Sequence, residues 1–227
     1  MTTKAACVAR IATRAVDRRR RLPRHRAMFG GETSVERLWL VVNDAAPPGK
    51  ELKYARLERE RRFLLRVSPA EGVVKTTRIA DRYLLGTRLR LRRAIETVTV
   101  GGIGERTVYK LTQKVPAPDG GPGLITTLYL DAVEYAVLEQ LPAATVHKTR
   151  LSVPPLGIDV FEDALAGLVL AEAEFDDDES LESFIPPREA VAEVTQDQRL
   201  TGGNLAVTTK AEIEAVLADY GLFDRAR

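Results

Sequence analysis

Charged residues recur at every second position in short stretches of this chain, and that pattern limits the folds open to it. The clearest stretch, Leu57–Leu65, reads LERERRFLL. Successive side chains of a β-strand point to opposite faces, so residues two apart share a face. The sequence therefore predicts a strand here, with Glu58, Glu60 and Arg62 on one of its faces.

Two further stretches sort their charges by sign. Leu170–Phe175 reads LAEAEF, which places Glu172 and Glu174 on one face of a predicted strand. Arg88–Arg92 reads RLRLR, with three arginines on one face and two leucines on the other. A solvent-exposed sheet face usually mixes the two signs, because like charges directly opposite each other destabilise a strand pair.

Other segments supply mainly basic side chains. Lys114 ends the segment LTQK, and Lys148 and Arg150 lie two residues apart. Two like charges about 5 Å apart repel by roughly 3 kcal/mol at an effective dielectric constant near 20. Arginines gathered on one face therefore need anionic partners, and paired carboxylates need a cation.

A closed barrel that holds both clusters inside satisfies both needs. Its acids would bind a divalent metal through oxygen ligands. Its bases would bind a polyanion, for which arginine is a favoured planar donor. The alternative is a sheet with one solvent-exposed face, on which alternating charge is common.

The order of the predicted elements favours an antiparallel sheet or barrel. Short segments rich in Val, Leu, Thr, Tyr and Arg alternate with turn clusters such as Pro116–Gly123, without regular strand–helix alternation. We expect three helices. One is capped by Asp131 and has Val133, Val137 and Leu141 on a shared face.

The second predicted helix starts near Asp178 or Ser180, and the third opens at Thr209 and ends at Gly221. Asp178 belongs to the acidic run DDD, which we interpret as a solvated helix start and not as a metal site. The glycines of Gly101–Gly104 lie between two predicted strands, so we interpret them as a hairpin turn and not as a dinucleotide loop.

The first 50 residues differ from the rest of the 227-residue chain. Residues 1–26 hold nine Lys and Arg residues against one acid, and Pro47–Gly49 resembles a linker. We expect two parts: a basic, disordered extension over 1–50 and a folded domain over 51–227. Nucleic acid is an unlikely partner except through the arginine-rich arm, which also has the composition of an organelle presequence.

Composition excludes several classes of protein. The single cysteine excludes an internal disulfide, and two histidines with one cysteine make a Cys/His metal site implausible. No stretch approaches about 18 consecutive apolar residues, so no membrane span is predicted. No secretory signal follows the basic start, and we expect a cytoplasmic protein. His147 precedes Lys148 in a predicted strand, and we interpret it as structural rather than as a general base.

The motifs resemble those of the CYTH superfamily, the triphosphate tunnel metalloenzymes. LERERRF is similar to the ExExK signature of that family. The resemblance continues in chain order over about residues 53–206 through the segments DRYL (81–84), RLRLR (88–92), LTQK (111–114), HKTR (147–150), IDVF (158–161), LAEAEF (170–175), FIPP (184–187) and EVT (193–195).

This resemblance implies a mainly β (α+β) protein with an eight-stranded antiparallel, tunnel-like barrel and flanking helices. It implies that Mg²⁺ or Mn²⁺ binds to Glu58, Glu60, Glu172 and Glu174. Implied contacts to a triphosphate or polyphosphate come from the basic residues Arg62, Arg90, Arg92, Lys114, Lys148, Arg150 and Arg199. Glu58, Glu60 and Lys114 are the implied catalytic residues.

Metal-dependent hydrolysis of an inorganic or organic triphosphate is the activity that we expect. Two departures from the family pattern leave alternatives open: Thr126–Leu130 carries no acid where many relatives have an acidic pair, and Gly202–Asn204 replaces frequent lysines. The alternatives are a polyphosphate- or nucleotide-binding module without chemistry, and adenylyl cyclase chemistry, which rests on family membership alone. Asp159 either contacts the tunnel ligand or forms a structural salt bridge.

Overall fold

The computed structural model describes residues 53–98, 104–117 and 122–223, which belong to one compact unit. The expectations for residues 1–50 and for the glycines at 101–103 lie outside the described residues. None of the described helices is long and apolar enough to cross a membrane.

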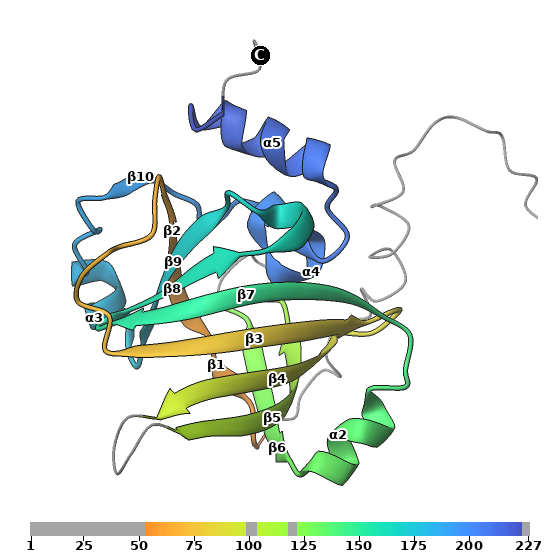
Figure 1. The fold of residues 1–227 in the computed structure, drawn as a ribbon. Coiled ribbons are helices and arrows are strands. Elements are labelled where there is room, and N and C mark those ends of the chain that lie inside the picture. The colour runs from red at the N-terminus through yellow and green to blue at the C-terminus, as the bar shows by residue number, and fades with distance from the viewer. Residues whose placement is uncertain (1–52, 99–103, 118–121, 224–227) are drawn as a thin grey trace, which may run out of the picture. The chain divides into compact units, whose positions relative to one another are not determined.

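Ten antiparallel strands form one sheet in the order β1-β6-β5-β4-β3-β7-β8-β9-β2-β10 (Figure 1). The strands are β1 (Arg56–Leu57), β2 (Arg59–Leu65), β3 (Lys75–Leu84), β4 (Leu89–Val98), β5 (Gly104–Val115), β6 (Leu124–Leu130), β7 (Ala143–Val153), β8 (Leu156–Phe161), β9 (Val169–Phe175) and β10 (Ala190–Glu193).

The mainly β, antiparallel class is confirmed, but the count of eight strands is wrong. The predicted first strand is interrupted at Glu58, so that it forms both the two-residue β1 and β2. In addition, β10 pairs with the end of β2 as a short edge strand.

One continuous segment brings the two sides of the sheet together. Arg56 and Leu57 of β1 pair with β6, whereas β2, which begins one residue after Leu57, pairs with β9. The backbone N–H of Glu58 between them donates to the carbonyl of Gly123 at 2.8 Å. The sheet is thus curved around an interior. The pairing between β1 and β6 is short and consists of Arg56 opposite Ile125 and Leu57 opposite Leu124.

The alternation on β2 assigns its side chains to opposite sides of the sheet. Arg59 pairs with Asp178 at 2.6 Å, and Arg61 holds Glu193 through two hydrogen bonds of 3.0 and 2.6 Å. These odd-numbered residues attach helix α3 (Asp178–Ser183) and β10 to the outer surface. The even-numbered residues face the interior.

Helix α3 begins as predicted. Asp177 is its N-cap and accepts a hydrogen bond from the Ser180 backbone N–H at 2.7 Å. Asp178 lies in the first turn, where a carboxylate is favourable to the helix dipole. The acidic run is therefore a helix start.

Helix α2 (Ala132–Leu138) also begins at the predicted cap, with a reciprocal capping box between Asp131 and Glu134. The expected apolar face is not its packing face. Val133 and Val137 are 73% and 67% exposed, and Tyr135 is the buried residue of the helix. Its ring lies 4.5 Å from that of Tyr109 on β5, because the side of α2 that meets the sheet is the one carrying this tyrosine.

The C-terminal elements close one end of the interior. Helix α5 (Lys210–Asp219) has the predicted capping box between Thr209 and Glu212, and Gly221 follows it with φ of +70°. Helix α4 (Gly202–Leu205) precedes it. The main core cluster joins these helices to the sheet and consists of Leu64, Val146, Phe161, Leu165, Leu168, Leu170, Val194, Leu200, Leu205, Ile213, Val216 and Leu217.

Gly202 brings α4 into direct contact with strand β3. A Cβ atom at this position would lie 1.9 Å from the hydroxyl oxygen of Tyr83, a side chain that packs against the core cluster. Only a glycine fits between α4 and this ring.

We expect Gly202→Ala to destabilise the fold by about 1–3 kcal/mol, because the new methyl group overpacks the contact with Tyr83. Chemical denaturation measures the change. Gly104→Ala is the control, since no atom lies within 4 Å of its added Cβ. Equal stabilities of the two variants would contradict this account of the packing, and Tyr83→Phe should recover part of the loss.

Candidate functional site

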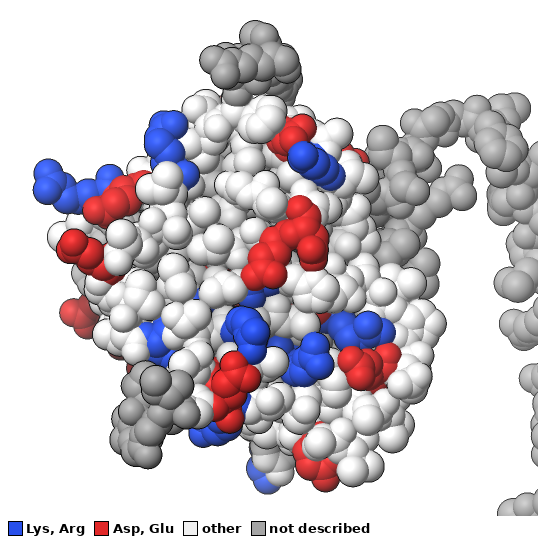
Figure 2. Space-filling view, viewed as in Figure 1, with Lys and Arg blue, Asp and Glu red and all other residues white. Residues whose placement is uncertain are grey.

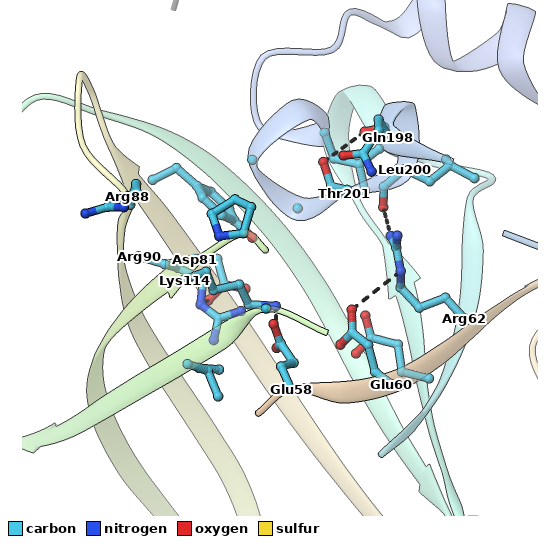
Figure 3. Close-up of a pocket in the computed structure, with 18 of the residues that line it drawn as sticks. Glu58, Glu60, Arg62, Asp81, Arg88, Arg90, Lys114, Gln198, Leu200 and Thr201 are labelled. Atoms are coloured by element: carbon cyan, nitrogen blue, oxygen red, sulfur yellow. Dashed lines mark hydrogen bonds and ion pairs between the residues drawn. The ribbon is translucent and has the colours of Figure 1, made fainter. Parts of the chain in front are cut away.

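The interior of the curved sheet contains a cavity of about 920 Å³. Charged side chains from separate strands converge in it (Figure 3). The charged lining residues of its inner face are Glu58, Glu60, Arg62, Asp81, Arg88, Arg90, Arg92, Lys114, Lys148, Arg150, Glu172 and Glu174.

Strand register brings the predicted acidic pairs together. Glu60 lies directly opposite Glu174 in the β2–β9 ladder, and Arg62 lies opposite Glu172. Directly opposed residues share a face of the sheet. The charged faces of β2 and β9 therefore form one continuous surface that points into the interior.

Asp81 forms the first of two buried ionic centres. Arg92 donates from Nε and Nη2 to the two carboxylate oxygens at 2.6 and 2.7 Å, and Arg90 Nε lies 3.7 Å from one of them. Burial tends to raise the pKa of Asp81, but the positive charges of Arg92 and Arg90 outweigh it and hold the pKa well below the usual range. Asp81 is therefore an anion at neutral pH.

Asp159 forms the second centre and is completely buried. Lys148 Nζ donates to it at 2.5 Å, and Arg150 donates two hydrogen bonds of 2.6 and 2.7 Å. Of the two roles left open for Asp159, the structure shows the salt bridge. Gly157, opposite Glu172 in the β8–β9 ladder, leaves room for the Arg150 side chain, which passes 3.4 Å from the position of an added Cβ.

The two centres position the bases that the sequence assigned to ligand binding. Arg92 and Lys148 each have a buried aspartate as partner, so their charged ends are held in place. Arg90 differs, because its buried Nε has no hydrogen-bond partner. The Nε of Arg62 is likewise buried without a hydrogen-bond partner.

The glutamates pair with different bases. Lys114 Nζ lies 2.6 Å from Glu58, where Figure 3 shows the two side chains meeting. Arg150 Nη2, which already donates to Asp159, also donates to Glu172. The positive charge of Arg150, followed by those of Lys148 and Lys114, keeps the pKa of Glu172 below its usual range although burial acts in the opposite direction.

Glu60 is less well compensated than Glu58 and Glu172. Its ion-pair partner among the described residues, Arg62 Nε, is 3.6 Å away. Burial raises the pKa of Glu60, and repulsion from Glu172 and Glu58 adds to the rise against the attraction of Lys114. Burial and the neighbouring carboxylates therefore both disfavour the charged form of Glu60.

Arg62 is engaged mainly with the backbone. Its Nη1 donates to the carbonyl of Leu200 at 2.6 Å and its Nη2 to that of Thr195 at 2.7 Å, as the upper part of Figure 3 shows for Leu200. The side chain is buried. Arg62 thereby connects the segment before α4 to β2. Both terminal nitrogens of its guanidinium group therefore donate to groups within the chain.

Two sequence-selected residues lie away from the cavity lining. Arg199 pairs with Asp197 and Asp219, each at 2.8 Å, and is half exposed. The structure does not bring it together with the other predicted ligands of the substrate. His147 is exposed, and its Nδ1 lies 2.7 Å from Asp163, outside the site.

The cavity occupies only part of the interior. No residue of Lys75–Ala80 or Ala94–Val98 lines it. The inward side chains Thr77, Ile79 and Ala94 are buried there. On the β3–β4 side the cavity therefore ends at the level of Asp81 and Arg92.

The donor chemistry fits a hard divalent cation. Glu58, Glu60 and Glu172 interact electrostatically, and Glu174 lies opposite Glu60. Carboxylate oxygens are the ligands that Mg²⁺ prefers. In the described part of the chain, however, no three acidic or histidine side chains are arranged to hold an ion, because Glu58 and Glu172 turn toward bases.

Sequence reasoning gave Asp81 no role in the site. Its position in the predicted strand DRYL carried a signal, since the residue is a single acid on the inward face opposite an arginine-rich strand. On the face of the molecule shown in Figure 2, acidic and basic side chains lie next to each other.

No family model matches the chain, and no curated protein matches it significantly. A solved structure described as the inorganic triphosphatase NE1496 is similar, with 24% sequence identity and a TM-score of 0.44, covering 67% of this chain and 96% of that one. A second, described as the hypothetical protein NE1496, has 25% identity and a TM-score of 0.44 over 67% and 99%. Both likenesses are low, so function has to be inferred from this chain's own side chains.

We expect Asp81→Asn to cost about 3–5 kcal/mol of folding stability, because it leaves Arg92 and Arg90 buried without their counter-charge. Urea denaturation at neutral pH measures the loss. Glu105→Gln removes an exposed ion pair with Arg78 and should cost less than about 1 kcal/mol.

The difference between wild type and Asp81→Asn should also depend on pH. The folded-state pKa of Asp81 is depressed, so its contribution is fully present above the carboxyl pKa of the unfolded chain, about 4. It should decrease as the pH falls below that value toward the folded-state pKa. A difference that is independent of pH between 7 and 2.5 would contradict the ion-pair account.

Proposed function

We propose that this chain hydrolyses a linear triphosphate within the cavity and that the reaction requires Mg²⁺ or Mn²⁺. The observation that supports the proposal is the convergence of six basic side chains from four strands with four glutamates from two segments in one enclosed volume. The basic side chains are Arg62, Arg90, Arg92, Lys114, Lys148 and Arg150.

The basic side chains would bind the phosphate chain. Transfer of a phosphoryl group requires mainly positioning and neutralisation of charge on the non-bridging oxygens. Arg90 has an unpartnered Nε, and Lys114 is the more exposed of the paired lysines. We assign both to direct contact with phosphate oxygens, and Arg92 and Lys148 to the fixed positive charge of the cavity wall.

The glutamates Glu58, Glu60, Glu172 and Glu174 would hold the metal ion. When bound, such an ion neutralises phosphate charge and lowers the pKa of a coordinated water. Glu58 and Glu60 are the proposed catalytic carboxylates and accept hydrogen bonds from the attacking water. The water oxygen would form a bond to the terminal phosphorus as one of these carboxylates accepts its proton. The bond from that phosphorus to the bridging oxygen would break, and its electron pair would leave with that oxygen on the diphosphate part of the substrate.

The cavity accommodates substrates with or without an organic group. Its charged part ends at Asp81, and its lining also includes the aliphatic residues Leu85, Pro116, Pro122 and Ile125 near the β3–β4 and β5–β6 connections. Both inorganic triphosphate and an organic triphosphate therefore remain within the proposed substrate class.

A binding module without chemistry is the second candidate. Two observations favour it: Thr126–Leu130 of β6 contributes no acid, and the basic residues of the cavity are largely neutralised by internal carboxylates. Such a protein would bind a polyphosphate without releasing product.

Phosphate release from inorganic triphosphate, ATP and thiamine triphosphate, with Mg²⁺ or Mn²⁺, tests the proposal. We expect Glu60→Gln and Glu172→Gln to reduce kcat by about 100-fold, because each removes a carboxylate that acts on the reacting centre. Glu105→Gln, an exposed residue outside the cavity lining, should retain wild-type activity.

Absence of phosphate release from all three compounds would contradict hydrolysis of these substrates. If calorimetry then detected tight binding of triphosphate, the result would favour the binding module. Circular dichroism of both glutamate variants is needed to show that the folded structure persists.

A further inference from the structure

The basic side chains of the cavity fall into two classes according to their partners. Arg92 and Lys148 pair with Asp81 and Asp159, which are 1% and 0% exposed. A ligand in the cavity has no access to these carboxylates. The two pairs are therefore fixed, since breaking either one would leave a charge buried without a partner.

The second class pairs with accessible glutamates. The side chain of Lys114 is 44% exposed and that of Glu58 is 21% exposed. Arg150 also reaches Glu172, whose side chain is 20% exposed, while it keeps its two hydrogen bonds to Asp159. Among the glutamates that line the cavity, Glu58 and Glu172 are thus the ones that an entering cation would meet already paired with the basic side chains Lys114 and Arg150.

We propose that Lys114, together with the Nη2 of Arg150 that bridges Asp159 and Glu172, is an exchangeable counter-ion that couples divalent-cation binding to polyanion binding. This inference rests on the proposed function, because it concerns the same cavity. In the ligand-free protein Lys114 forms an ion pair with Glu58. When a cation binds to Glu58 in place of Lys114, the lysine pairs with a phosphate oxygen instead.

The coupling follows from the pairing pattern. A divalent cation on Glu58 leaves Lys114 without its ion-pair partner, whereas Arg150 retains Asp159 when it leaves Glu172. An uncompensated charge in an enclosed site is unfavourable, so an anion gains affinity. Binding free energies are reciprocal, and the anion strengthens cation binding to the same extent.

Glu58 and Glu172 differ from Glu174 in that each forms an ion pair with a basic side chain of the cavity. All three line the cavity, but Glu174 has no ion pair with a described base. Removing the charge of Glu174 changes the net charge of the cavity without releasing a lysine. Glu174→Gln is thus a control for charge alone, matched to Glu58→Gln.

The anion arm of the test uses calorimetry in EDTA with a triphosphate analogue in which NH groups replace the bridging oxygens. Glu58→Gln should bind this analogue at least fivefold more tightly than wild type, because Lys114 is released without any metal. Glu174→Gln should stay within twofold of wild type.

The cation arm measures the affinity for Mn²⁺ by electron paramagnetic resonance, in the absence of any phosphate compound. Lys114→Met should bind Mn²⁺ at least fivefold more tightly than wild type, because Glu58 is freed. Arg88→Met removes one positive charge from the same cavity without breaking an ion pair between described residues, and this variant should bind Mn²⁺ within twofold of wild type.

The outcomes separate the inference from the proposed function. If Glu58→Gln gains no more than Glu174→Gln, or Lys114→Met no more than Arg88→Met, counter-ion exchange is wrong while triphosphate binding stands. If neither wild type nor any variant binds the analogue, with or without Mg²⁺, both the exchange and the proposed function are wrong.

Discussion

Two buried aspartates make a charged interior possible in this fold. Basic side chains inside a curved sheet repel one another and lose hydration, and both effects oppose folding. Asp81 on β3 and Asp159 on β8 flank strand β7 and accept bidentate hydrogen bonds from Arg92 and Arg150. Because these pairs are satisfied within the chain, the cavity keeps its basic wall without a ligand.

Strand β2 connects this interior to the outer surface. Its inward residues include Glu60 and Arg62, and its outward residues Arg59 and Arg61 bind α3 and β10. Arg62 extends the connection by holding two carbonyls of the C-terminal segment. One seven-residue strand therefore sets the position of the acids, of a covering helix and of the closed end of the core.

The period of two in the sequence was sufficient to find most of the cavity. It placed Glu58, Glu60, Glu172 and Glu174 on inward faces, because strand geometry fixes which side chains share a face. It could not show that Arg62 would turn to Leu200 and Thr195, since these carbonyls lie more than 130 positions away in the chain. The apolar spacing on α2 was also misleading, because Tyr135 is on the side that meets the sheet.

The sequence by itself determined the antiparallel class, the helix starts at Asp131 and Thr209 and the identity of the inward charges, because these depend on local geometry and on neighbours in the chain. Only the tertiary structure decided which base each acid neutralises. That choice depends on strand register and on burial, which make Asp81 and Asp159 inaccessible while Glu58 and Glu172 remain open to the cavity. The tertiary structure also decided the partners of Arg199, which lies in the short helical turn Gln198–Leu200 and pairs with Asp197 and Asp219.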